Sequence, residues 1–239
     1  DMPDQSRGFL FENCIFDEDD SNYALYDKDG RGEEGLVLID CVMYAKDYCV
    51  YVNNQVVSIN CTFAATDAAA PALVFIGTSS KASFFDGCVF DGGVEGIDTR
   101  SDYVTLVANS TFYNQTTYCL EFNDSKALLV EYNNIYVVAD SDADIAVKRS
   151  NGSVMYSDYS CAWSVANSPP SSAEAWPEGQ GDNSIIVDPL LVNAGSNDFR
   201  LQATSPCLHT GISTIGSGTT SMGAWKRKQH PAKVRLDGT

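Results

Sequence analysis

Hydrophobic and polar positions along the chain repeat in a four-residue motif: a polar corner residue, a small residue, a variable residue and a large apolar residue. Its seven copies lie at residues 13–16, 40–43, 60–63, 87–90, 109–112, 133–136 and 160–163. The intervals between successive copies drift around roughly 24 residues, which is typical of stacked supersecondary units whose loops differ in length.

Each repeat predicts three short strands. An apolar run, such as 36–39 or 56–59, precedes the motif, and the motif itself opens a second strand. Asn, Asp or Gly at its first position suits the tight corner between the two strands. Because side chains alternate along a strand, the second and fourth motif positions share a face, and we expect them to stack as two inward columns.

The predicted third strands align without a gap at residues 23–26, 48–51, 71–74, 95–98, 118–121 and 145–148. Their third positions are all aliphatic and should face the core, with the residues on both sides facing outward. These inward residues are Leu25, Val50, Leu73, Ile97, Leu120 and Val147. The outward fourth positions, from the first rung to the sixth, are Tyr26, Tyr51, Val74, Asp98, Glu121 and Lys148.

Three strands per turn with polar corners and inward columns predict an all-β fold, a right-handed parallel β-helix. About seven rungs spaced by about 4.8 Å give a body roughly 34 Å long. We expect rungs over residues 1–163 and a loop rich in Ser, Pro, Glu and Gly over 164–183. The final partial coils with a C-terminal cap should occupy 184–225, and a basic tail 226–239.

Four segments near the C-terminus follow one another in order: DPLLV (188–192), NDFRL (197–201), SPCL (205–208) and MGAW (222–225). This series resembles the closing segment of secreted bacterial right-handed β-helix repeat proteins of the pectate-lyase-like superfamily. The resemblance implies that these residues form the last partial coils and the cap. The chain departs from the family at His209, where an acidic residue is usual, and at Trp225, where the family often has Gly-Ala-Tyr-Glu. The resemblance therefore concerns the fold and transfers no activity.

The net charge of −17 is distributed unevenly. Residues 226–239 carry +4, which leaves −21 for the rest of the chain. Such an acidic body repels nucleic acid and anionic membranes and suits calcium, cationic surfaces or neutral glycans. No stretch approaches the roughly 20 apolar residues of a membrane helix, so no membrane insertion is expected. Without an initiating Met or a signal-like segment, the chain is expected to be a mature form or a fragment.

Most of the eight cysteines fall on repeat positions, where a buried Cys acts as a small hydrophobe. Free thiols and disulfides between neighbouring rungs both remain open for these positions. Five Asn-x-Ser/Thr sequons predict glycosylation and hence an extracellular protein, secreted or on the surface of a cell or virion. Their asparagines are Asn60, Asn109, Asn114, Asn123 and Asn151.

The outward column of the third strands contains the candidate chemistry. Neighbouring rungs bring Asp98 and Glu121 about 5 Å apart, the carboxylate separation of a retaining glycosidase. Lys148 on the next rung is a candidate base or ion partner, so these three residues are the candidate catalytic set. The candidate carbohydrate-binding residues around them are Tyr26, Tyr51, Arg100 and Arg149. A solvated sheet face with mixed charges is the alternative interpretation.

An acidic loop combines carboxylates with glycine in the manner of a calcium site. Its candidate ligands for Ca²⁺ are Asp27, Asp29, Glu33 and Glu34. The spacing does not fit an EF-hand, and a solvated acidic loop without metal is the alternative.

The sequence predicts an extracellular or surface-associated structural β-helix that faces a polysaccharide or another glycan and has no catalysis of its own. The alternative is a polysaccharide lyase or glycoside hydrolase that acts from the face of the third-strand sheet. Only seven residues precede Gly8, too few to cover the N-terminal opening of a solenoid. Two interpretations follow: either an upstream domain has been removed, or another copy stacks end to end on this opening, which would generate filaments. The basic tail, opposite in sign to the acidic body, favours stacking.

Overall fold

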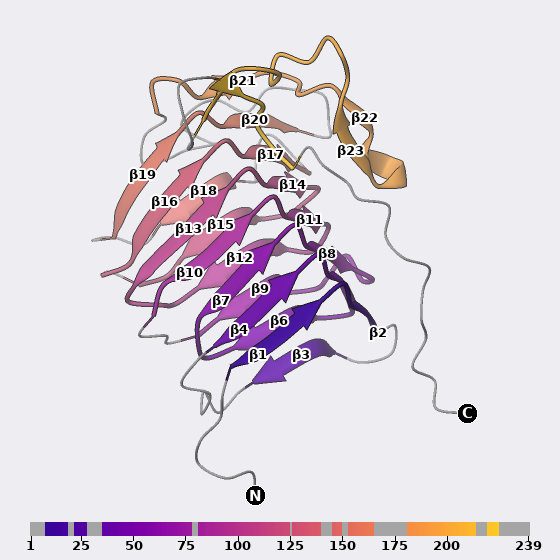
Figure 1. Ribbon diagram of the computed structural model, residues 1–239, viewed down its shortest axis with the longest axis vertical. Coiled ribbons are helices and arrows are strands. Elements are labelled where there is room, and N and C mark those ends of the chain that lie inside the picture. Colours follow the sequence, from indigo (N-terminus) through magenta and orange to yellow (C-terminus); the bar gives the residue numbers. More distant parts are fainter. Residues whose placement is uncertain are drawn as a thin grey trace, which may run out of the picture.

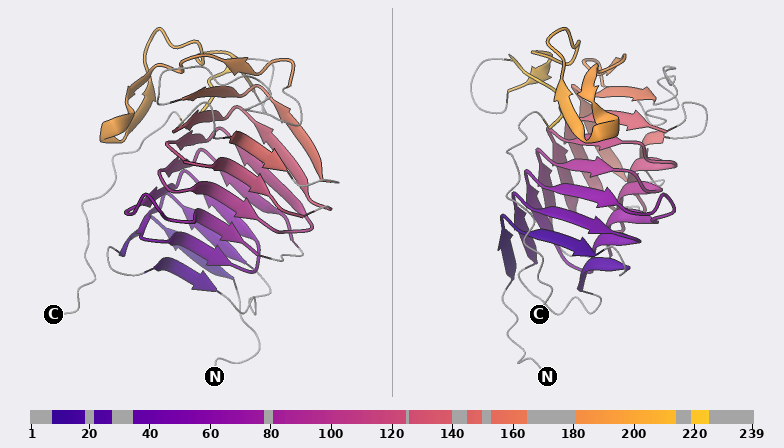
Figure 2. Two further views of the ribbon diagram at one scale, coloured as in Figure 1. Left: turned by 180° about the vertical axis from the view of Figure 1, so that it is seen from behind. Right: turned by 90° about the vertical axis from the view of Figure 1, so that its right-hand side faces the viewer.

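The computed structural model describes residues 8–18, 22–27, 35–77, 81–124, 126–139, 145–149, 153–164, 181–213 and 219–224. Within the coils, each strand pairs in parallel with the strand three places before it in the sequence. Three sheets therefore run along the molecule and form a parallel β-solenoid (Figures 1 and 2). Six coils contain all three strands, and β19 and β20 begin a seventh. The prediction of a parallel β-helix with three strands per coil is confirmed.

The three sheets follow the predicted order of strands within each repeat. Sheet A consists of β1 (Phe9–Glu12), β4 (Leu36–Ile39), β7 (Val56–Ile59), β10 (Ser83–Asp86), β13 (Val104–Ala108), β16 (Leu128–Tyr132) and β19 (Val154–Asp158). Sheet B consists of β2 (Ile15–Glu18), β5 (Val42–Ala45), β8 (Thr62–Ala65), β11 (Val89–Asp91), β14 (Thr111–Tyr113), β17 (Ile135–Val138), β20 (Cys161–Ser164) and β21 (Ile185–Ile186). Sheet C consists of β3 (Tyr23–Asp27), β6 (Tyr48–Val52), β9 (Ala72–Ile76), β12 (Glu95–Thr99), β15 (Tyr118–Phe122) and β18 (Ile145–Arg149).

The corner between sheets A and B is a single residue with a left-handed backbone in all seven coils. Its φ angles lie between 50° and 63° at Asn13, Asp40, Asn60, Gly87, Asn109, Asn133 and Tyr159. Asn, Asp and Gly adopt this conformation at the lowest cost, which explains their recurrence at the first motif position. The seventh motif therefore begins at Tyr159, one residue before the predicted position. Ala162, in register with Tyr136, faces the core there in place of Trp163.

The second motif position does more than fill space. The Ser110 hydroxyl accepts a hydrogen bond from the Cys88 N–H at 3.1 Å, and the Asn134 side chain accepts one from the Ser110 N–H at 2.9 Å. Ser160 and Ser184 continue this ladder at 3.1 Å each. Each corner thus leaves a buried N–H that the next coil satisfies with a side-chain acceptor. Cys, Ser and Asn are interchangeable here because each is small and offers an acceptor atom. All eight cysteines are free thiols.

The third strands differ from the predicted alignment in one rung. Val74, and not Leu73, is in register with Val50 and Ile97, so Phe75 takes the outward place assigned to Val74. The residue before the aliphatic column is also buried, contrary to prediction; examples are Cys49, Leu73, Gly96, Cys119 and Ala146. Two consecutive residues thus face inward in each third strand. A Cβ at Gly96 would lie 2.5 Å from the Cys119 carbonyl oxygen, which shows how tightly this bend is packed.

The closing segment lies against the outer face of sheet B at its C-terminal end (Figure 2). It contains β22 (Leu191–Asn193), η1 (Ala194–Ser196), β23 (Asp198–Leu201), β24 (Gly211–Ile212) and β25 (Thr219–Thr220). Met222 and Cys207 are buried against Ile135 and Cys161, forming a second apolar cluster outside the solenoid core. The Thr111 hydroxyl accepts the Ala224 N–H at 3.0 Å and is fully buried as a result.

No helix in the described part of the chain has the length and apolarity that a membrane crossing requires.

Candidate functional site

The outer face of sheet C carries two columns of side chains that run along the solenoid. In a regular strand, residues i and i+3 point to opposite faces. The two consecutive inward residues of each third strand change this, so the first and fourth positions both face outward. The first column contains Tyr23, Tyr48, Ala72, Glu95 and Tyr118. The second contains Tyr26, Tyr51, Phe75, Asp98, Glu121 and Lys148.

The first three coils of this face, nearest the N-terminus, form an aromatic patch made of Tyr23, Tyr26, Tyr48, Tyr51 and Phe75. Tyr23 and Tyr48 stack with ring centroids 5.5 Å apart, and Tyr51 stacks on Phe75 at 4.5 Å. Tyr26, at the end of the patch, is 50% exposed. Tyr23, Tyr48 and Tyr51 are partly exposed, and Phe75 is buried beneath them. Mutually packed rings of this kind offer a rigid apolar surface with tyrosine hydroxyl groups at its edge.

The fourth and fifth coils of the same face form an acidic cluster made of Glu95, Asp98 and Glu121. One carboxylate oxygen from each of the three residues lies within 4.8 Å of the others. Asp98 and Glu121 are direct neighbours in register, as the sequence predicted, and Lys148 follows them in the same column. The Lys148 Nζ atom forms an ion pair with Glu121 Oε1 at 2.9 Å. The structure thus brings the predicted catalytic set together and adds Glu95 to it.

Polar and cationic groups hold the cluster in place. Arg100 Nη2 lies 3.3 Å from Asp98 Oδ2, and Asn123 Nδ2 donates to Asp98 Oδ1 at 3.1 Å. Lys148 also donates to the Tyr118 hydroxyl at 2.7 Å. The Arg100 guanidinium lies 5.0 Å from the centre of the Phe75 ring, so it links the cluster to the aromatic patch. The two halves of the face therefore form one continuous surface.

Burial and mutual repulsion of the carboxylates set the protonation of this cluster. Burial, followed by the charges of Glu121 and Asp98, raises the pKa of Glu95 to about 8. Burial also raises the pKa of Asp98, although Arg100 and Asn123 oppose this shift. The hydrogen bond to Tyr118, and then the contacts with Glu121, raise the pKa of Lys148. At neutral pH, Glu95 is therefore a protonated acid beside other carboxyl groups.

Oxygen donors at this separation are of the kind that Ca²⁺ binds. Arg100 and Lys148, however, already pair with Asp98 and Glu121. A cation would have to displace both ion pairs, so the cluster in its present arrangement suits acid–base or hydrogen-bonding chemistry better than metal binding.

We expect the Glu95→Gln variant to lose the pH dependence of stability that Glu95 contributes. The folded protein keeps the Glu95 proton up to a pKa of about 8, whereas an unfolded chain releases it near 4.5. The resulting stabilisation is complete below pH 4.5 and is lost as the pH rises through 8. Urea unfolding of both proteins across this range measures it. The unmodified protein should lose stability relative to Glu95→Gln as pH increases, and parallel curves would contradict the shifted pKa.

Arg149 and the described calcium candidate Asp27 do not lie on the outer face that bears the acidic cluster. Arg149 is in register with the buried Phe122, in the column that faces the interior, and donates to the carbonyl oxygen of Ser153. It is therefore separated from the face that bears Tyr26. Of the predicted calcium ligands, Asp27 is the last residue of β3, whereas Asp29, Glu33 and Glu34 lie outside the described residues.

The predicted glycosylation sites differ in accessibility. Asn60, Asn114 and Asn123 are exposed, and Asn123 borders the acidic cluster through its hydrogen bond to Asp98. Asn109 lies in a side-chain ladder: it donates to Asp86 at 2.7 Å and accepts from Asn133 at 3.0 Å. Asn151 lies outside the described residues. The exposed asparagines are thus better placed to carry a glycan than Asn109.

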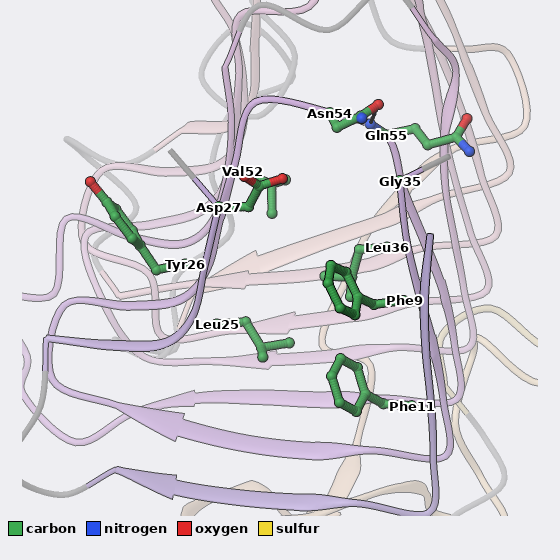
Figure 3. A pocket seen from close by; sticks show the side chains of 10 residues that line it. All are labelled: Phe9, Phe11, Leu25, Tyr26, Asp27, Gly35, Leu36, Val52, Asn54 and Gln55. Atoms are coloured by element: carbon green, nitrogen blue, oxygen red, sulfur yellow. Dashed lines mark hydrogen bonds between the residues drawn. The ribbon is translucent and has the colours of Figure 1, made fainter. Parts of the chain in front are cut away.

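A hollow of about 200 Å³ opens at the N-terminal end of the solenoid. Figure 3 shows Phe9, Phe11 and Leu25 turned toward one another inside the first coil, while Tyr26 points away from it. The described part of the first coil thus presents apolar side chains at its mouth.

Neither a scan against protein-family models nor searches of curated proteins and of solved structures found a match for this chain.

Proposed function

We propose that the protein is a structural, glycan-binding β-solenoid module that binds a polysaccharide along the outer face of sheet C. The observation that carries the proposal is the continuity between the aromatic patch and the acidic cluster, which Arg100 and Phe75 connect. Sugar rings have apolar faces that pack on aromatic rings, and their hydroxyl groups pair with carboxylates, amides and guanidinium groups. A face with rings at one end and such groups at the other matches both properties.

The charge of the protein favours a neutral glycan. With a net charge of −17, the molecule repels polyanionic chains, and the cations Arg100 and Lys148 are already paired with carboxylates. Neutral saccharides avoid this repulsion and use the same carboxylates as hydrogen-bond acceptors.

We expect the double variant Tyr26→Ala with Tyr51→Ala to bind its glycan at least about tenfold more weakly, because it loses two stacking surfaces and 1.4 kcal/mol corresponds to tenfold. Glycan-array screening of the unmodified protein identifies the ligand, and titration calorimetry measures the affinities. Tyr103→Ala is the matched control, since Tyr103 is also half exposed but lies outside sheet C. Unchanged affinity in the double variant, or no binding to neutral or acidic glycans by the unmodified protein, would contradict the proposal.

A second candidate is a polysaccharide lyase or glycoside hydrolase acting from the same face. The observation that favours it is the protonated Glu95 beside Asp98 and Glu121, with carboxylate oxygens within 4.8 Å. Environments that separate the pKa values of adjacent carboxyl groups create an acid and a base, and retaining glycosidases use a similar separation. Glu95 would donate the proton to the leaving oxygen, and an ionised partner would act as base or nucleophile.

The two candidates differ in their products. If the protein is an enzyme, incubating it with a glycan that it binds releases new reducing ends or unsaturated sugars. Glu95→Gln should abolish this release while binding persists. If the unmodified protein binds a glycan and releases nothing, only the binding function stands.

We further propose that the solenoid winds in the right-handed sense and that the chain is related to the pectate-lyase-like superfamily. We also propose that the protein acts outside the cell or on a surface. Support comes from the closing segment, whose motifs contact one another. The Ser205 hydroxyl donates to the Pro189 carbonyl at 2.5 Å, and the Met222 N–H donates to the Cys207 carbonyl at 3.0 Å. The exposed sequon asparagines Asn60 and Asn114 support an extracellular location.

End-to-end stacking remains part of the proposal. The strands β1, β2 and β3 each form the edge of their sheet, and an edge strand recruits further strands. The apolar mouth around Phe9 and Phe11 lies at the same end. A second copy placed there would extend all three sheets, and light scattering at low and high salt measures such growth.

A further inference from the structure

An apolar column of side chains runs along the outer face of sheet A from one end of the solenoid to the other. One outward column runs through all seven strands in continuous register: Leu10, Val37, Val57, Phe84, Leu106, Val130 and Tyr156. We call it the apolar column. A second outward column beside it contains Val104, Leu128 and Val154 in the upper coils. None of these side chains is charged, although one residue in five of the chain is.

Solvent reaches this face along its whole length. Leu10 and Tyr156, at the two ends of the apolar column, are 63% and 66% exposed, and Val154 is 50% exposed. The five central residues of the apolar column are all partly exposed. In Figure 1 sheet A faces the viewer, and no described segment crosses its strands.

The outer faces of the other two sheets are either covered or polar. The closing segment covers the upper part of sheet B, and sheet C carries polar and aromatic groups suited to water. Parallel sheets are normally covered on both faces, and contiguous apolar surfaces of this extent mark interaction sites. Sheet A therefore has the properties of an interface without its partner.

We propose that two copies of this chain pack face to face through the outer face of sheet A. Seven strands spaced by about 4.8 Å and about 15 Å of strand length give a footprint of roughly 500 Å² per copy. Two copies bury roughly 1,000 Å², which is the lower limit for a specific interface. Two sheets at about 10 Å separation interdigitate their side chains as the layers of a β-sandwich do.

The distribution of charge also selects a second copy. A protein with a net charge of −17 repels itself over most of its surface, and the apolar column contributes no charge to that repulsion. A symmetric contact is self-complementary, so one apolar face suffices for both partners.

The border of the face defines the orientation of the pair. The next outward column contains the only charged residues of the three columns, the acidic Glu12, Asp86 and Asp158, which alternate with the uncharged Ile39, Ile59, Ala108 and Tyr132. A two-fold axis parallel to the solenoid axis lays this border over the uncharged column of Val104, Leu128 and Val154 in the other copy. An axis along the strands would place the two acidic borders against each other. The first arrangement, with parallel solenoids, therefore avoids like-charge contact.

Sedimentation velocity of the full chain over a hundredfold range of concentration tests the proposal. We expect the mass to rise from 25.9 kDa to a dimer of twice that value, with end-to-end stacking adding further mass only beyond the dimer, and high salt should leave the dimerisation unchanged or strengthen it. The double variant Val57→Lys with Leu106→Lys should weaken dimerisation at least tenfold, since it buries two ammonium groups per copy. Each lysine makes the net charge less negative, so added repulsion between whole molecules cannot cause the loss.

The matched control is Thr66→Lys with Thr204→Lys, which places two lysines on exposed positions outside sheet A and should dimerise normally. Oxidative side-chain labelling of the unmodified protein provides a second measurement that needs no variant. Phe84, Leu106 and Tyr156 should become protected as the concentration rises. A monomer at all concentrations, a dimer that survives the lysine variant, or unchanged labelling would overturn the proposal. Open-ended growth that the lysines leave intact would assign association to the solenoid ends.

Discussion

Substitution of Phe90 by Ala is expected to lower the free energy of unfolding by about 3–5 kcal/mol, the range found when a buried Phe is removed. Phe90 is fully buried in the inward column of sheet B. Its ring stacks on Phe112 at a centroid distance of 4.4 Å and on Phe63 at 5.0 Å. The variant loses both stacking contacts and leaves a cavity, because the rungs above and below are fixed by their sheet hydrogen bonds.

Thr62→Ala is the control for this prediction. Thr62 lies one residue before Phe63 on the outward side of the same sheet and remains partly exposed. Its replacement should change stability by only about 0.5 kcal/mol. Urea unfolding monitored by circular dichroism measures both variants, and equal destabilisation would contradict the assignment of inner and outer faces.

We expect Glu131→Leu to cost at least about 3 kcal/mol, because each buried donor that it leaves unpaired costs about 1–3 kcal/mol, although the new side chain is hydrophobic and of similar size. Glu131 is 1% exposed and lies in an otherwise mainly apolar inward column between Val107 and Ser157. Its Oε2 atom accepts hydrogen bonds from Asn134 Nδ2 at 2.9 Å and from the Tyr136 hydroxyl at 2.9 Å. The hydroxyl groups of Ser157 and Ser160 donate to the same carboxylate. Leucine would leave these four donors, of which all but Ser157 are buried, without this acceptor.

Ser157→Ala provides the comparison for Glu131, because it removes one donor and keeps the acceptor. It should cost only about 1 kcal/mol, as expected for the loss of a single hydrogen bond. Burial raises the pKa of Glu131, while its four donors oppose the shift. A Glu131→Leu variant as stable as the unmodified protein would show that these donors find other partners.

The sequence alone was sufficient for the repeat, the three strands of each coil and six of the seven corner residues. The reason is that these features depend on local chemistry: Asn, Asp and Gly favour a left-handed corner, and side chains alternate along a strand. The same reasoning brought Asp98, Glu121 and Lys148 into one column, because parallel register fixes which residues are neighbours between rungs.

Two features of the candidate site could not be predicted in this way. Glu95 and Asp98 are three residues apart, which in a regular strand places them on opposite faces, yet the bend at Gly96 and Ile97 turns both outward. A signal was available in the sequence, since Tyr23 with Tyr26 and Tyr48 with Tyr51 occupy the same two positions of earlier rungs. The shift of β9 by one residue was hidden because Leu73 and Val74 are both apolar, so either satisfies the pattern.

The amino-acid sequence by itself therefore determined the solenoid, six of its seven corners and the vertical neighbours in every rung of the third strands except that of β9. Tertiary structure decided which outer face is covered and which is exposed, because covering depends on segments distant in the chain. Met222 and Cys207 bury Ile135 and Cys161 on sheet B, whereas the apolar column of sheet A remains open to solvent. It also decided the protonation of Glu95, because its pKa depends on burial and on charges that only folding brings within 4.8 Å.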